Sequence, residues 1–261
     1  ALWREHRSRG LALLAALVVG TVPFGVSRFT VNHDISVRQA PWRTSVADLD
    51  GRAIVFVADT APYLLYLNPF SSNSPNLDDR ILYASDRDPA MLDLIAEHPD
   101  RTPYLQQGSV AAPDVGPRED PYDLSVTLVP VTVERGRTLQ LTITPASPPE
   151  TTRLVVTLEA DGVKEERAMP GAAAGPITFV VPVDDLAPRG HLTVTLGQGR
   201  DDEDARAHPV LRHELEYRIV DGQIEVLLPS AAYQNVLVDG ELVWRRTFSL
   251  PELGLDVTAA G

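Results

Sequence analysis

The sequence predicts a chain of the α/β plus all-β class, with an N-terminal transmembrane helix, a small parallel α/β unit and a β-sandwich. Three observations lead to this prediction: an uncharged apolar run near the start, a strand–helix–strand pattern behind it, and regularly spaced short strands in the second half. The predicted divisions are a basic flank and transmembrane helix at 1–29, an α/β domain at 30–107, a linker at 108–121 and a β-sandwich domain at 122–261.

The apolar run at 11–26 contains no charged residue and follows Arg4, Arg7 and Arg9. As a helix it reaches roughly 24 Å, slightly less than a bilayer core of about 30 Å, so residues just after it would anchor at the far interface. The arginines place the first residues in the cytoplasm and the bulk of the chain outside the cell membrane. A signal peptide, a buried core helix and an interfacial helix are the alternatives, although residues 21–27 offer no clear signal-peptidase site.

The start of the chain also suggests its context. It begins with Ala, and Pro23 lies inside the apolar run, where the freed backbone carbonyl needs a neighbouring helix or water. We therefore expect the run to be the last helix of a larger membrane protein. Its expected partners are membrane lipid and upstream transmembrane helices of the same protein.

Composition narrows the partners further. The chain has 261 residues, a formal net charge of −13 and no cysteine. The absence of cysteine excludes disulfides, thiolate nucleophiles and cysteine-based zinc sites. The acidity argues against a nucleic-acid partner, because neutralising phosphates requires clustered Lys and Arg.

A small α/β unit is predicted from the pattern at 53–107. Residues 53–58 (AIVFVA) form a continuous apolar run typical of a strand that is buried on both faces. Residues 80–84 predict a second strand, and Asp88-Pro89 predicts the start of a helix at 90–98. Residues 102–107 predict a third strand, parallel to the second across the helical crossover.

A polar ligand site is predicted at the carboxyl ends of these strands, where ligands bind in open α/β sheets. The long segment 59–79 is rich in aromatic residues, Asn, Ser and Pro, and connections of that length are usually functional. Aromatic rings would stack on a sugar while Asn and Asp bond its hydroxyls. Alternatively, the rings cover the small core or rest on the membrane, and Asn and Asp form turns. The predicted ligand-binding residues are Asp59, Tyr63, Asn68, Asn73, Asn76, Asp78, Asp86 and Arg87.

The pattern of this unit, with LYASD before the helix and HPDRTPY after it, covers about residues 28–107. It resembles a segment after the last transmembrane helix of some prokaryotic GT-C glycosyltransferases, similar to the dolichyl-phosphate-mannose protein mannosyltransferase and aminoarabinose transferase group. The resemblance implies a lipid-phosphate sugar donor and an acidic catalytic residue, sometimes with a metal, in an outer loop upstream. No catalytic residue is therefore transferred to this chain. The positions that match the segment, without an assigned role, are Asn73, Asp78, Asp86, Pro99, Asp100 and Arg101.

A β-sandwich is predicted after residue 121, because short alternating stretches recur about every ten residues between turn-forming pairs such as Asp161-Gly162 and Asp221-Gly222. Without cysteines it would be a generic immunoglobulin-like or fibronectin-like sandwich. Trp244 is predicted to pack in the core rather than to serve as a ligand platform. The predicted strands are 124–133, 138–144, 153–160, 177–182, 191–196, 211–220, 223–229, 235–238 and 241–247.

Known catalytic patterns are absent from the sequence. His208 and His213 are five residues apart, so in a strand they would face opposite sides and a zinc site is not expected. The acidic run at 200–206 lacks the order of an EF-hand, and a solvated loop is expected there rather than a calcium site. No catalytic residue, metal site or cofactor is predicted for this chain.

These observations predict an extracytoplasmic C-terminal region of a polytopic glycosyltransferase-like protein that helps to position a glycan or a glycosylation acceptor. The alternative is a single-pass cell-surface protein whose sandwich binds carbohydrate or a protein partner. A standalone soluble enzyme would require a catalytic cluster that the sequence does not contain.

Overall fold

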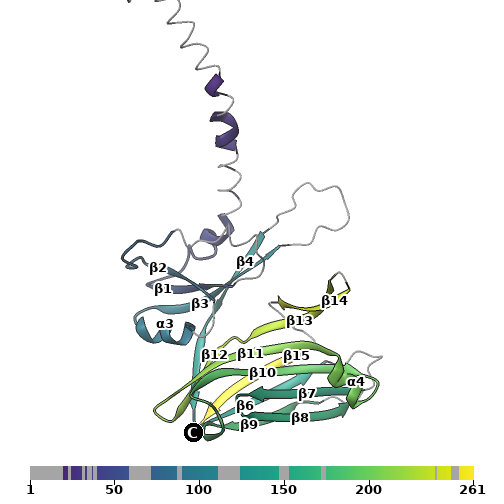
Figure 1. The fold of residues 1–261 in the computed structure, drawn as a ribbon. Helices are drawn as coiled ribbons and strands as arrows, with labels where there is room; N and C mark the ends of the chain where they lie inside the picture. Colours follow the sequence, from purple (N-terminus) through teal and green to yellow (C-terminus); the bar gives the residue numbers. More distant parts are fainter. Residues whose placement is uncertain are drawn as a thin grey trace, which may run out of the picture.

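A computed structural model of the chain describes residues 20–22, 25–30, 33, 37, 40–58, 72–86, 90–110, 124–146, 153–171, 175–238, 240–247 and 253–261. In Figure 1 a small α/β unit lies on a larger β-sandwich, and the described residues 20–22 and 25–30 lie beyond the α/β unit, away from the sandwich. Within those residues no helix has both the length and the apolar character needed to cross a membrane. Residues 11–19, 23 and 24 of the predicted spanning run lie outside them.

The first sheet contains the predicted parallel strands. Its central strand, β1 (Ala53–Val57), pairs in parallel with β2 (Ile81–Ser85) on one side and β3 (Thr102–Val110) on the other. All five residues of β1 are buried, which agrees with its uninterrupted apolar sequence. A fourth strand, β4 (Leu124–Pro130), pairs antiparallel with β3, so the strand order is β2-β1-β3-β4.

Both faces of this sheet are covered. On one face, α3 (Met91–Glu97) buries Met91 and Leu92. The helix begins one residue later than predicted, and its N-cap, Ala90, has no side chain that could cap it. The predicted capping pair Asp88-Pro89 lies outside the described residues. On the other face, the helical turn at 40–44 buries Trp42 against β1 and Tyr83. The buried Gln106 amide holds this turn by donating to the Trp42 carbonyl at 2.8 Å.

The sandwich is formed by an eight-stranded sheet and a three-stranded sheet that face each other. The larger sheet runs β14-β13-β11-β10-β7-β8, with β12 beside β11 and β5 beside β12, and the smaller runs β15-β6-β9. The strands are β5 (Thr132–Gly136), β6 (Thr138–Pro145), β7 (Arg153–Ala160), β8 (Val163–Pro170), β9 (Ile177–Pro182), β10 (Arg189–Gly199), β11 (Pro209–Val220), β12 (Gln223–Leu228), β13 (Ala231–Val238), β14 (Glu241–Thr247) and β15 (Leu253–Ala260). The short 3-10 helix η4 (Val183–Asp185) joins β9 to the chain leading into β10.

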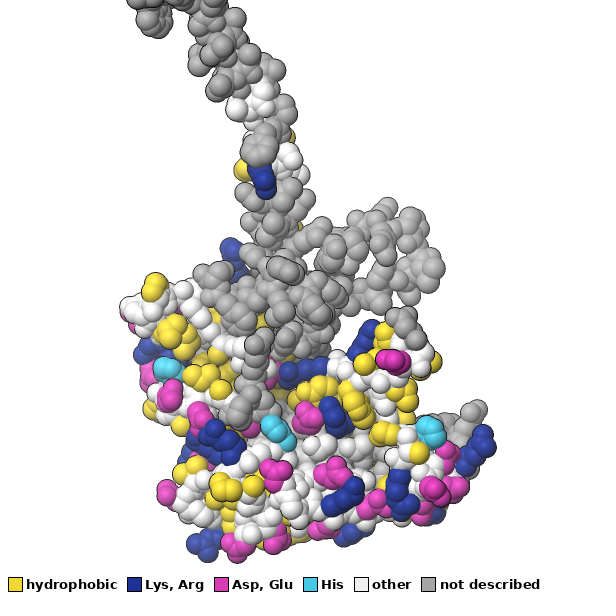
Figure 2. All heavy atoms as spheres, viewed as in Figure 1, with side chains coloured by type: hydrophobic (Ala, Val, Ile, Leu, Met, Phe, Trp, Pro, Cys, Tyr) yellow, Lys and Arg dark blue, Asp and Glu magenta, His cyan; other side chains and the backbone are white. Residues whose placement is uncertain are grey.

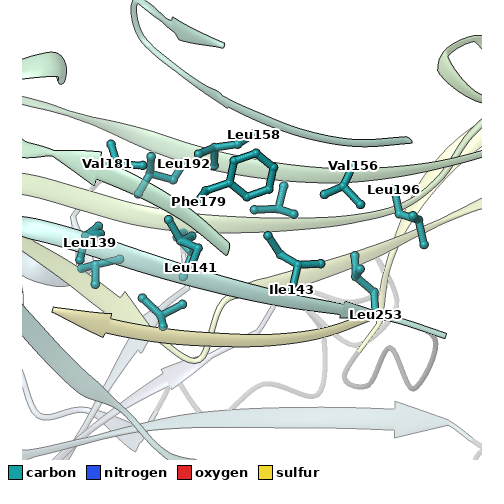
Figure 3. Close-up of a cluster of buried hydrophobic side chains, with 14 of the residues drawn as sticks. Leu139, Leu141, Ile143, Val156, Leu158, Phe179, Val181, Leu192, Leu196 and Leu253 are labelled. Atoms are coloured by element: carbon teal, nitrogen blue, oxygen red, sulfur yellow. The ribbon is translucent and has the colours of Figure 1, made fainter. Parts of the chain in front are cut away.

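The inward-facing residues of the two sheets form the main core. Figure 3 shows Leu139, Leu141 and Ile143 of β6 facing residues of the larger sheet such as Leu158 and Leu192. Along β6 these side chains alternate with less buried residues, as a half-buried sheet requires. The alternation in the sequence therefore predicted correctly which face of β6 is buried.

Several details differ from the sequence predictions. The predicted strand 124–133 is two strands, and β4 joins the α/β sheet because it pairs with β3 rather than with the sandwich. Residues 108–110 of the predicted linker continue β3, and residues 111–121 lie outside the described residues. Strands β8 and β15 were not predicted. Trp244 is partly exposed on the outward face of β14 instead of packing in the core.

The acidic run at 200–206 is a short helix rather than a loop. In α4 (Asp202–Ala207), the Asp201 side chain caps the helix by accepting hydrogen bonds from Glu203 N and Asp204 N. The helix lies on β10 with Ala205 fully buried. A Cβ on Gly197 would lie 1.9 Å from the Ala205 carbonyl oxygen, so only glycine permits this approach.

The α/β unit and the sandwich share one apolar cluster. Met91 and Leu92 of α3 pack with Val131 and with Leu227 of β12. Beside this cluster, Asp93 accepts hydrogen bonds from Arg189 at 2.8 Å and from Arg218 at 2.7 Å. Burial alone would raise the pKa of Asp93, but the two arginines outweigh it and lower that pKa. The helix is therefore fixed to the larger sheet by both apolar and charged contacts.

A buried histidine connects the two sheets of the sandwich. His213 of β11 lies 7% exposed, with Nδ1 at 2.7 Å from Ser230 Oγ and Nε2 at 3.0 Å from the Leu253 carbonyl. Burial lowers the pKa of His213, although the hydrogen bond to Leu253 acts in the opposite direction. The neutral ring satisfies both partners when Nε2 donates to Leu253 and Nδ1 accepts from Ser230.

The approach of α4 to β10 predicts that Gly197→Ala is strongly destabilising. We expect a loss of about 3 kcal/mol in the free energy of unfolding, the upper end of the range for overpacked interiors, because backbone atoms must move. Gly254→Ala is the matched control, since its Cβ would lie 3.5 Å from the nearest atom, an ordinary contact. Denaturant unfolding of the two variants measures the difference, and equal losses would contradict the predicted contact.

The burial of His213 predicts that stability falls when the pH is lowered. Because folding lowers the His213 pKa below its ordinary 6.5, the unfolded chain binds more protons just below pH 6.5. The stabilisation is complete above that pH and declines below it, by up to about 1.4 kcal/mol for each unit of pKa difference.

Denaturant unfolding between about pH 7.5 and about pH 5.5 tests this dependence. His213→Gln retains a donor for Leu253 and should show a shallower decline than the unmodified chain. A parallel decline in the two proteins would rule out His213 as its source.

Candidate functional site

The structure places only some of the predicted ligand-binding residues. Asp59, Tyr63, Asn68 and Arg87 lie outside the described residues. Asn73 lies beside β2, where its Nδ2 donates to the Tyr83 carbonyl at 2.7 Å and its Oδ1 accepts from Tyr83 N at 2.8 Å. Its amide extends the hydrogen bonding of the edge strand, so both of its polar atoms serve the fold.

Asn76 and Asp78 lie at the amino end of β2, not at the predicted carboxyl end. Asn76 Nδ2 donates to Asp78 Oδ2 at 2.6 Å within a turn. The physical reason is connectivity, because a segment that leads into a parallel strand must first return to the edge where that strand begins. The buried Arg101 holds this turn by donating to the Leu77 carbonyl at 3.1 Å and the Asp79 carbonyl at 2.8 Å.

Asp86 lies where the prediction put it, directly after β2 at the carboxyl edge of the sheet. Its backbone N–H donates to the Val57 carbonyl at 3.2 Å, which keeps it beside the end of β1. Its carboxylate forms an ion pair with Arg246 of β14, and the two side chains are only 11% and 14% exposed. The predicted site residue therefore faces the sandwich and contacts a residue far along the chain.

A pocket of about 80 Å³ lies at this junction between the α/β unit and the outward face of the larger sheet. Its apolar wall includes Met91, Leu105 and Leu227. The polar residues that line it are Asp86, His191, Glu214, Glu216, Tyr233 and Arg246. We call this set of residues and the space that they enclose the junction pocket.

The side chains around the junction pocket are held by one another. Arg212 forms an ion pair with Glu214 at 3.0 Å, and its guanidinium lies 4.7 Å from the ring centres of both Tyr233 and Trp244. Burial and the neighbouring Glu214 carboxylate raise the pKa of the Tyr233 phenol, so it is protonated at neutral pH. Figure 2 shows acidic and basic side chains interspersed over the sandwich.

This arrangement is suited to hydrogen bonding. Carboxylates accept hydrogen bonds, guanidinium groups donate them, and the phenol of Tyr233 can do both. In the described part of the chain, no three His, Cys, Asp or Glu side chains are grouped as a metal site would need. The pocket can therefore bind hydroxyl or amide groups through paired donors and acceptors.

The sandwich residues of the pocket were not predicted as site residues. They alternate with core residues: Glu214 and Glu216 flank the buried Leu215, and His191 precedes the buried Leu192. A usable signal was present, because Arg212, Glu214 and Glu216 put three charged side chains on one face of a strand at the centre of the sheet. Glutamate is depleted in strands, so two glutamates at this spacing in a central strand are a local signal.

Comparison with known proteins gives one match. The model of a family described as a domain of unknown function (DUF7846) matches residues 53–225. No curated protein and no solved structure matches the chain. The matched residues extend from the first residue of β1 into β12, and they include Asp86, His191 and both glutamates of the junction pocket. Because the match spans more than half of its length, the chain belongs to the DUF7846 family.

Proposed function

We propose that this chain is the extracytoplasmic C-terminal region of a polytopic membrane glycosyltransferase-like protein, where it helps to position a glycan or a glycosylation acceptor. In this proposal residues 11–26 span the membrane, and the sandwich is of the immunoglobulin or fibronectin type. The catalytic residues lie upstream, and the chain binds rather than reacts.

The observation that carries the proposal is the junction pocket. It combines carboxylates, a protonated phenol and an arginine in a partly buried, apolar-walled space. Sugar hydroxyls both donate and accept hydrogen bonds, so a site with paired donors and acceptors matches them better than a site of one kind. The walls come from two structural units, which is a common location for ligand sites.

A second candidate function, a cell-surface protein that binds a protein partner, is favoured by the end of the β13–β14 hairpin. Leu237 and Leu242 face each other across the two strands and are 70% and 59% exposed. Val243, the next residue of β14 and therefore on the opposite face of the hairpin, is 44% exposed. Apolar side chains gathered at an exposed hairpin are typical of a protein contact.

The proposed function predicts that Asp86→Asn weakens glycan binding. We expect a loss of about tenfold or more, because a hydrogen bond to a charged group contributes about 1.5–3 kcal/mol. Binding of the full 261-residue chain to a printed glycan array, followed by calorimetry with the glycans that bind, measures the effect. Asp78→Asn is the matched control, since Asp78 lies at the opposite edge of the sheet.

Asp86→Asn leaves the Arg246 guanidinium without its charge partner and can destabilise the fold. Glu214→Gln, at a side chain that is 25% exposed, is therefore measured alongside it. If the folded variants bind glycans as tightly as the unmodified chain, the junction pocket is not the binding site. If the unmodified chain binds no glycan, the proposed function itself is wrong.

A further inference from the structure

The junction pocket alone is too small for a complete ligand. Its volume of about 80 Å³ is well below the roughly 300–1,000 Å³ typical of small-molecule sites. It can hold one projecting group, such as a hydroxyl or hydroxymethyl group, with a few water molecules. The rest of a bound molecule must therefore lie outside it.

A second hollow of about 550 Å³ lies on the same outward face of the larger sheet. It is formed by the turn between β7 and β8 together with the start of β10, and His191 lines both spaces. Its other polar lining residues include Glu159, Asp161, Lys164 and Thr193. We call this space the hairpin hollow.

The sheet register places these groups in a row. His191 faces Glu216 across β10 and β11, and Thr193 faces Glu159 across β10 and β7. From β13 to β7 there are three neighbouring-strand steps, which together span roughly 14 Å at about 4.8 Å each. This row is longer than one sugar ring, so its ends would contact different parts of a ligand.

Gly190, which lines the hairpin hollow, lies beside a tyrosine of the sandwich core. Tyr217 is fully buried, and within the described residues its hydroxyl has no partner at normal hydrogen-bond geometry. A Cβ on Gly190 would lie 3.0 Å from that hydroxyl and 3.1 Å from Asp161 Oδ2. Burial raises the pKa of Tyr217, and the nearby Asp161 charge raises it further, although the Ala187 backbone lowers it. A hydroxylic group beside Gly190 would enter a polar environment.

We propose that the ligand is a glycan of at least two sugar residues, which runs along this face from Asp86 past His191 to Asp161. The inference rests on the proposed function and adds the length and path of the ligand. One projecting group enters the junction pocket, and a neighbouring sugar occupies the hairpin hollow. The Glu159–Lys164 ion pair and Asp161 bond the hydroxyls of that second sugar.

The test measures how affinity depends on glycan length, in the unmodified chain and in a variant whose hairpin hollow is blocked. The full chain and its variants are applied to a printed array of mono- to hexasaccharides, and affinities are then measured by calorimetry. Thr193→Trp places a large ring in the hairpin hollow and should lower affinity for disaccharides and longer glycans about tenfold. Thr142→Trp is the matched control, because Thr142 is also a half-exposed strand residue but lies on the three-stranded sheet.

Asp161→Asn is a second, milder variant, because asparagine suits the same Asp-Gly turn. It should lower the affinity for long glycans several-fold without changing the midpoint of thermal unfolding. If glycans bind with an affinity that does not depend on length, and Thr193→Trp has no effect, the inference is overturned and the proposed function stands. If no glycan binds, but an unglycosylated peptide binds and Thr193→Trp abolishes that binding, the inference and the proposed function are both overturned.

Discussion

The packing of α3 against the sandwich is the constraint on which the candidate site depends. The helix shares an apolar cluster with Leu227, and its Asp93 is bonded by two arginines of the larger sheet. Arg218 also pairs with Glu225, and these two side chains are only 15% and 5% exposed. This pair lies within the larger sheet and holds the Arg218 guanidinium where it reaches Asp93, so the helix packs against a fixed partner. The junction pocket keeps its shape because its two walls are fixed to each other.

The elements that the sequence predicted well are those whose burial matches a simple period. Strand β1 is apolar throughout and buried on both faces, while β6 alternates and is buried on one. Strand β4 also alternates, but alternation specifies a face and not a neighbour, so its pairing with β3 was not predictable. Strand β8 (VKEERAMP) lies at a sheet edge, where little burial is needed, and its charges conceal it.

The candidate site was predictable only where local topology determined it. Asp86 follows a parallel strand, and a residue in that position must lie at the carboxyl edge of the sheet. Its partners come from strands more than a hundred residues later, and nothing local in the sequence brings Tyr233 or Arg246 to it. Asn76 and Asp78 show the opposite error, since composition indicated ligand binding while connectivity placed them in a turn at the other edge. Composition thus identified the residue types, and only the tertiary arrangement shows which of them lie at the candidate site and which form a turn.

The charges along the outward face bear on the kind of ligand that fits it. Asp86 pairs with Arg246, Glu214 with Arg212, and Glu159 with Lys164, so much of the charge is already compensated within the protein. A charged ligand would have to compete with these ion pairs. A neutral ligand rich in hydroxyls can instead hydrogen-bond to carboxylate oxygens and N–H groups without displacing these ion pairs. Because the buried Asp86–Arg246 pair holds its two side chains in place beforehand, binding beside it loses little side-chain entropy, which favours a neutral glycan over an ionic molecule.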